Sequence, residues 1–192
     1  LAIEAERALY DWRQVLTAEK VDQDDRIVMV VYTDETLAAT GKRSPLDRTI
    51  LAKALARIDS FKPKAIGIDI LIDQPQPEDP IIKDAFVKLK TPTFLAYASA
   101  STAEDKIMLW QQQFLEAFQK DIATGPVKPA SIVLQTDDDN VLRSWPKALR
   151  GLPDILPLAL EPQRRALFAG FDGSIRYRLP VYNERPVFAA IP

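Results

Sequence analysis

The chain has 192 residues, 47% hydrophobic and 27% charged, which is typical of one folded globular α/β domain. Its formal net charge is −2, from 25 basic and 27 acidic side chains, and the basic residues form no block, so nucleic acid is not an expected partner. The absence of cysteine and histidine excludes disulfides, thiol nucleophiles, histidine acid–base relays and zinc sites with Cys or His ligands.

Residues 1 to 18 carry apolar side chains at spacings of three and four, which predicts an amphipathic helix. These residues are Ala5, Ala8, Leu9, Trp12, Val15 and Leu16. The helix either packs on the domain or continues an upstream membrane helix as a stalk or dimer seam, and we expect Trp12 to be buried as its anchor. We therefore divide the chain into a stalk helix, 1–20, and a single α/β domain, 21–192, and expect a targeting segment before Leu1.

Strand and helix patterns alternate along the chain up to about residue 125. The β-branched run at 27–32 predicts a central parallel strand buried on both faces. A helix follows from a Ser44 cap with Pro45 at its first position, then a strand at 64–72, a helix from Asp79-Pro80, a strand at 93–99 and a helix at 107–122. This order predicts a mainly parallel sheet with helices on both faces.

The C-terminal part has weaker patterns. We expect a strand at 131–136, a hairpin turn at the acidic run 137–140, and a short helix within 152–160 that is limited by its prolines. Two late strands at 174–179 and 186–191 are expected to add antiparallel pairs to the sheet.

Acidic residues gather where the first two predicted strands end. Asp34 and Glu35 follow the first strand, Asp69 lies within the second, and Asp73 follows it. Ligands of parallel sheets bind beyond the carboxyl ends of the strands, so these carboxylates are candidates to bind a cationic ligand or to chelate Mg²⁺ or Ca²⁺. The alternative is that Asp34, Glu35 and Asp73 only cap turns or helices.

Asp69 is flanked by isoleucines, so it needs a partner if it is buried. Arg48, on the apolar side of the preceding helix, is the expected partner, either as a structural ion pair or as part of a ligand clamp. We expect ligand-binding residues among Asp34, Glu35, Arg48, Asp69 and Asp73.

The sequence contains no glycine-rich phosphate loop and no activated serine, so no cofactor, resident metal or catalytic residue is expected. The alternative function is a divalent-metal-dependent phosphohydrolase in which Asp34, Asp69 and Asp73 bind Mg²⁺ and Glu35 acts as a base.

Three segments together resemble a known family. They are the strand 27–31 followed by Asp34-Glu35, the helix start Arg43-Ser44-Pro45-Leu46-Asp47-Arg48, and the run from Lys64 through Asp69 to Pro75. The chain is similar to the type-two CHASE domain, the cyclase- and histidine-kinase-associated extracellular sensory module. The ending, from Ile175 to Phe188, resembles the closing strands of this family.

The resemblance implies a binding module and not an enzyme: a periplasmic sensor in an inner-membrane receptor. The output would be a cyclase, a kinase of a two-component system, or a diguanylate cyclase or phosphodiesterase. The signal would be an unknown small molecule or protein, and a homodimer could form through the N-terminal helix.

Overall fold

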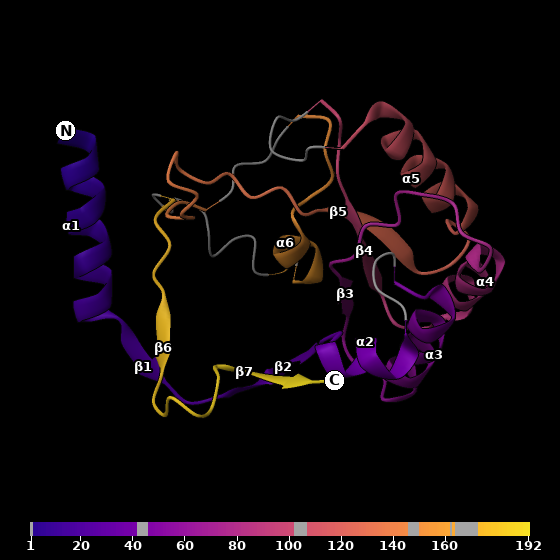
Figure 1. Ribbon diagram of the computed structural model, residues 1–192, viewed down its shortest axis with the longest axis horizontal. Coiled ribbons are helices and arrows are strands. Elements are labelled where there is room, and N and C mark those ends of the chain that lie inside the picture. Colours follow the sequence, from indigo (N-terminus) through magenta and orange to yellow (C-terminus); the bar gives the residue numbers. More distant parts are fainter. Residues whose placement is uncertain (1, 42–45, 102–106, 146–149, 162, 164–172) are drawn as a thin grey trace. The chain divides into compact units, whose positions relative to one another are not determined.

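The computed structural model describes residues 2–41, 46–101, 107–145, 150–161, 163 and 173–192 (Figure 1). The chain forms two compact units. The smaller unit combines Leu1–Arg43 with Ile175–Pro192, and the larger unit comprises Ser44–Ser174. Helices and parallel strands make up both units, which confirms the α/β class.

The larger unit is built on a three-stranded parallel sheet. Its strands are β3 (Ile66–Ile68), β4 (Thr93–Tyr97) and β5 (Val127–Ser131), in that order across the sheet. The strand expected at 131–136 begins four residues earlier and includes Pro129. β5 is the last strand of this sheet, and the other contact described on its outer edge is a bridge from Ser131 to Ile155. Pro129 thus sits in an edge strand, where a missing N–H is tolerated.

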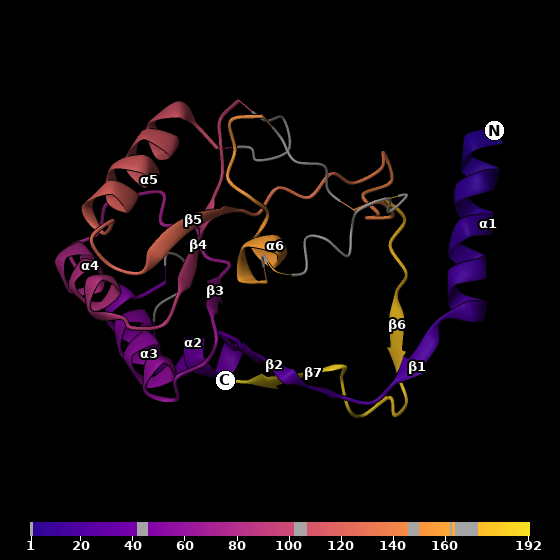
Figure 2. The same ribbon diagram turned by 180° about the vertical axis from the view of Figure 1, so that it is seen from behind.

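Helices cover both faces of this sheet, as the alternating pattern predicted. They are α3 (Arg48–Ser60), α4 (Asp79–Lys88), α5 (Leu109–Asp121) and α6 (Leu156–Leu160). Ile66 and Ile68 join the buried core with side chains of α3, α4 and α5, whereas a Cβ atom on Gly67 would lie 3.0 Å from Leu160 of α6. A side chain at position 67 would thus face α6, and its absence lets this helix approach the sheet. Figure 2 shows α6 on the side of the sheet away from α3, α4 and α5.

The helix expected to start at Ser44 starts at Arg48 instead. Asp47 is its N-cap residue, and the Asp47 carboxylate accepts hydrogen bonds from the backbone N–H groups of Thr49 and Ile50. A carboxylate there satisfies free N–H groups of the first turn and interacts favourably with the helix dipole. Ser44 and Pro45 lie outside the described residues.

The other end of α3 is tied to the segment before β4. Asp59 accepts hydrogen bonds from the backbone N–H groups of Lys90 and Thr91. Hydrogen bonding by the Thr91 side chain, followed by these backbone donors, lowers the pKa of Asp59. This carboxylate therefore helps to fix the position of β4 against α3 while it is ionised.

The acidic run 137–140 forms a turn, as expected, but the described residues on either side of it form no strand and hence no hairpin. The backbone N–H of Asn140 donates to the carbonyl of Asp137, and Asn140 has a positive φ of 62°. Arg143, which is buried, pairs with Asp137 at 2.8 Å and with Asp139 at 2.7 Å. The acids of the turn thus hold a buried arginine.

The smaller unit pairs the two ends of the chain. Its elements are α1 (Ala2–Thr17), β1 (Glu19–Val21), β2 (Asp24–Val30), α2 (Asp34–Thr40), β6 (Arg178–Pro180) and β7 (Phe188–Ile191). β6 runs parallel to β1, and β7 runs parallel to β2. The antiparallel strands expected at the C-terminus are therefore not found among the described strands; the antiparallel contact recorded there is an isolated bridge between Ser144 and Ser174.

The run predicted as a central, buried strand is exposed. β2 lies in a two-stranded sheet with β7, and Ile27 and Val28 are 47% and 56% exposed. The parallel direction was predicted correctly, but the central position was wrong for the described structure. Apolar side chains on both faces of a strand indicate that both faces favour burial. They do not specify which other strand pairs with it.

The N-terminal helix is present as α1, but its expected anchor is wrong. Trp12 is 64% exposed. The helix is attached by Tyr10 instead, whose hydroxyl donates a 2.6 Å hydrogen bond to the backbone carbonyl of Ile175.

Candidate functional site

The segment that follows β3 carries most of the predicted site. It runs from residue 69 to residue 78, beyond the carboxyl end of β3, and leads into α4. β3 ends at Ile68, so Asp69 is not part of the strand; its side chain is exposed. Asp73 is half-buried farther along the same segment.

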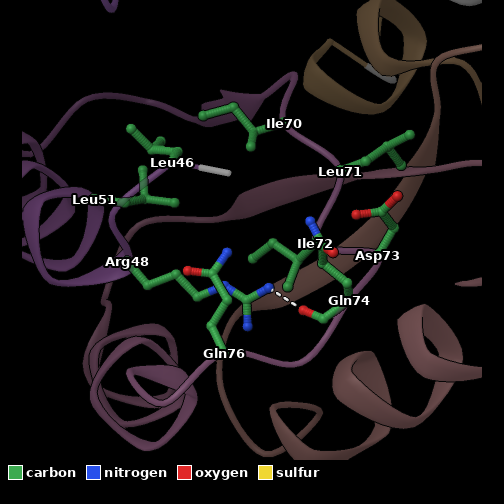
Figure 3. Close-up of a pocket in the computed structure, with 9 residues that line it drawn as sticks. All are labelled: Leu46, Arg48, Leu51, Ile70, Leu71, Ile72, Asp73, Gln74 and Gln76. Carbon is green, nitrogen blue, oxygen red and sulfur yellow. Dashed lines mark hydrogen bonds between the residues drawn. The ribbon is translucent and has the colours of Figure 1, made fainter. Parts of the chain in front are cut away.

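Arg48 is the buried centre of this region. It is 3% exposed and forms an ion pair with Asp79, the first residue of α4. Its Nη2 donates a 2.5 Å hydrogen bond to the backbone carbonyl of Gln74, and Figure 3 shows this bond reaching from α3 to the loop. The guanidinium also lies 5.8 Å from the ring centre of Phe118. Arg48 thus joins α3, the loop and the start of α4 to the core.

The ion pair expected between Arg48 and Asp69 is therefore wrong. Asp69 follows the end of β3 and is exposed, whereas Asp79 lies against the start of α3. Arg48 therefore pairs with Asp79. Among the described residues, no ion pair to Asp69 is formed. An exposed carboxylate needs no buried partner, because water solvates its charge.

Burial lowers the pKa of Arg48, and the negative charges of Asp73 and Glu78 oppose this shift. Asp73 therefore acts on Arg48 through its electric field, although no ion pair joins them in the part of the chain that the structure describes. The ordinary pKa of arginine lies far above neutral pH, so Arg48 stays charged and needs these acids around it.

Asp73 has a neutral partner that the sequence did not reveal. Nε2 of Gln111, in the first turn of α5, donates a 2.5 Å hydrogen bond to Asp73 Oδ2. The neighbouring Gln112 accepts hydrogen bonds through its Oε1 from the backbone N–H of Ala100 and the hydroxyl of Ser99. Both glutamines occupy the polar side of an amphipathic helix, where a sequence pattern gives no sign of a tertiary contact.

A small cavity lies between Arg48 and the loop (Figure 3). Its volume is about 20 Å³, and it is lined by Leu46, Arg48, Leu51, Ile70, Leu71, Ile72, Asp73, Gln74 and Gln76. This is enough for about one water molecule and too little for an organic ligand. A ligand of the region would therefore contact the outer side of the loop, where Asp69 is exposed.

Asp34 and Glu35 belong to the smaller unit, in the first turn of α2. Thr33 is the N-cap residue, and its hydroxyl accepts a hydrogen bond from the backbone N–H of Thr36. Acids in a first turn interact favourably with the helix dipole, so the alternative role of stabilising a helix start has physical support.

The described residues contain no group of three or more acids placed to hold a metal ion. Of the three acids on which the phosphohydrolase alternative depends, Asp69 and Asp73 belong to the larger unit and Asp34 to the smaller unit, so that alternative stays a prediction. No helix among the described residues combines the length and hydrophobicity that crossing a membrane requires.

The comparisons with known proteins give a family. No curated protein and no solved structure matches the chain. The family model of the CHASE2 domain matches residues 1–188 of the 192. CHASE2 domains are extracellular sensory domains of signalling receptors. The chain therefore belongs to the CHASE2 family of sensory domains.

Proposed function

We propose that this domain is the periplasmic sensor of an inner-membrane receptor and binds a cationic signal beyond the carboxyl end of β3. The observation that carries the proposal is Asp69, an exposed carboxylate without an ion pair among the described residues, directly after a buried strand. Asp73, held by Gln111, supplies a second carboxylate on the same loop. Ligand contacts by Asp34 and Glu35 stay predictions.

In this proposal Arg48 is a positioning residue. Its bond to the Gln74 carbonyl and its pair with Asp79 fix both ends of the segment that follows Asp73. A ligand that draws Asp73 away from Gln111 would shift the loop relative to α5. Such a signal needs a difference in ligand affinity between the two loop positions, of the order of 1–3 kcal/mol. The output, whether cyclase, two-component kinase or diguanylate cyclase or phosphodiesterase, is set by other parts of the receptor.

The location can be tested with a single cysteine, because the domain has none of its own. Lys53 is exposed on α3, so Lys53→Cys in the full-length receptor should react in intact cells with a charged maleimide that cannot cross the inner membrane. The unsubstituted receptor is the control for background labelling. Labelling that appears only after the inner membrane is broken would contradict a periplasmic domain.

The ligand site can be tested by thermal unfolding with a panel of small organic amines, Mg²⁺ and Ca²⁺. A cation that binds the loop should stabilise the domain, by about 2.7 kcal/mol at 100 times its Kd. The stabilisation should disappear in Asp69→Asn with Asp73→Asn and persist in Asp84→Asn, which changes an exposed acid of α4 paired with Lys88. Equal stabilisation of all three proteins would refute a site at these carboxylates.

A further inference from the structure

Trp110 is a large aromatic side chain that the core of the larger unit does not enclose. It lies in the first turn of α5 and is 51% exposed, so the unit to which it belongs covers less than half of it. Its indole Nε1–H donates a 3.2 Å hydrogen bond to the sulfur of Met108, which satisfies the polar edge of the ring within the same turn. The face of an indole ring is negative and attracts cations. Trp110 therefore offers a surface for a cation.

The first turn of α5 adjoins the acidic loop of residues 69–78. Gln111, the residue after Trp110, donates its 2.5 Å hydrogen bond to Asp73 of this loop. The loop contains three acids and no basic residue, and the first turn of α5 contains no charged residue. The indole and the negative charges of the loop thus belong to the same end of the larger unit.

The strip of α5 that contains Trp110 continues into contacts beneath this loop. Phe114 follows Trp110 by one helical turn, and its ring centre lies 6.2 Å from that of Phe118. Phe118 faces the guanidinium of Arg48 at 5.8 Å, and Arg48 bonds to the Gln74 carbonyl of the loop. The helical repeat therefore places Trp110 on the side of α5 that is directed toward the loop.

We propose that the cationic signal is a methylated organic ammonium ion, and that Trp110 binds it together with Asp69 and Asp73. This assignment rests on the proposed function, because it gives a ligand class to the same carboxylates. Methyl groups on an ammonium nitrogen reduce its hydration and spread its charge, so the ion packs against an aromatic face. The carboxylates balance its charge from the loop.

A divalent metal ion fits this surface less well. Mg²⁺ and Ca²⁺ take about six to eight oxygen ligands, and the described residues contain no group of three or more acids that could hold one. A methylated ammonium ion requires no fixed coordination geometry, so two carboxylates and one aromatic face can bind it. The nearby charge of Arg48 is buried and paired with Asp79, which limits its repulsion of the ion.

The indole N–H signals in a nuclear magnetic resonance spectrum provide the test. The chain has three tryptophans, so Trp12 and Trp145 are internal controls for Trp110. Titration of the 192-residue chain with choline chloride at constant ionic strength should shift the Trp110 signal with a Kd of about 1–10 mM, because exposed charge and cation–π contacts are each weak. The other two signals should stay in place. The uncharged carbon isostere of choline, 3,3-dimethylbutan-1-ol, should shift none of them.

Two substitutions of Trp110 separate the aromatic contact from simple apolar contact. Trp110→Phe should weaken choline binding about threefold and Trp110→Leu about tenfold, because Phe keeps a weaker aromatic face and Leu keeps only apolar area. Binding to these variants is followed through the backbone amide signals of the loop. Phe61→Leu, which changes an exposed aromatic residue stacked on Arg57, is the matched control and should leave the Kd unchanged.

The outcomes separate this assignment from the proposed function. Choline that shifts the loop amides but not the Trp110 signal, or binds Trp110→Leu with an unchanged Kd, would overturn the ammonium assignment and leave a cation site at Asp69 and Asp73. Binding of Mg²⁺ tighter than that of choline would do the same. No response to any of these cations up to about 50 mM, well above the expected Kd, would overturn the proposed ligand site as well.

Discussion

Replacing Arg48 by Met should lower the free energy of unfolding by about 3–5 kcal/mol, the cost of breaking a buried ion pair. The change leaves Asp79, whose side chain is 13% exposed, without its cation and removes the hydrogen bond to the Gln74 carbonyl. Urea unfolding of the domain measures the difference. The loop of residues 69–78 should lose protection from hydrogen exchange before the sheet does, because Arg48 joins this loop to α3.

The double variant Arg48→Met with Asp79→Leu separates the charge effect from the packing effect. A buried ion pair replaced by apolar residues of similar volume is often neutral in stability, so most of the loss should be recovered. Asp69→Ala is the matched single control and should cost less than about 1 kcal/mol, since exposed positions contribute little. A large loss in Asp69→Ala, or a small one in Arg48→Met, would contradict the assignment of Asp79 as the partner.

Replacing Phe118 by Ala should also destabilise the domain by about 3–5 kcal/mol. Phe118 is 1% exposed and packs edge-on against Phe86, with ring centres 6.2 Å apart. Its ring also faces Arg48 and Lys83, whose charged groups lie 5.8 Å and 5.1 Å from its centre. The truncation therefore removes an aromatic pair and a contact of the buried guanidinium together.

Phe61→Ala provides the matched control for this prediction. Phe61 is 69% exposed and stacks only on the guanidinium of Arg57 among the ring contacts of the described residues. Its loss should cost about 1 kcal/mol or less. Similar losses in both variants would show that Phe118 is not a core residue. Phe118→Ala and Arg48→Met should be non-additive, because the two side chains touch.

The helices of the larger unit could be predicted almost fully from the sequence. The apolar spacing that predicted α4 and α5 recurs in the core as Ile82, Phe86 and Phe118, and Pro80 marks the first turn of α4. Helices are specified by local periodicity and caps, so a short stretch of sequence contains most of the information. Gly67 shows the same economy of local information, because a glycine within a buried strand is typical of a closely packed helix, here α6.

Most strands were predicted as strands, but their partners were not, and β1 was not predicted because Glu19 and Lys20 fall in the range expected for the stalk helix. The run at 27–32 was expected at the centre of the main sheet, yet β2 pairs with β7 at the other end of the chain. A β-strand is stabilised by its neighbours, and apolar side chains on both faces fit many neighbours equally well. The parallel pairing of β1 with β6 likewise joins segments that are more than a hundred residues apart in the sequence. No local sequence pattern predicts such a pair.

The sequence by itself determined the class of the domain, its family resemblance, the candidate acids and the amphipathic helix at its start. Only the tertiary structure decided the partner of Arg48, the Gln111 bond to Asp73 and the bond of Tyr10 to Ile175. The physical reason is the same in each case. A charged or amide side chain can reach several partners, and its actual partner depends on where distant segments of the chain lie. Apolar periodicity predicts which face of a helix or strand is buried, but not the segment that packs against it.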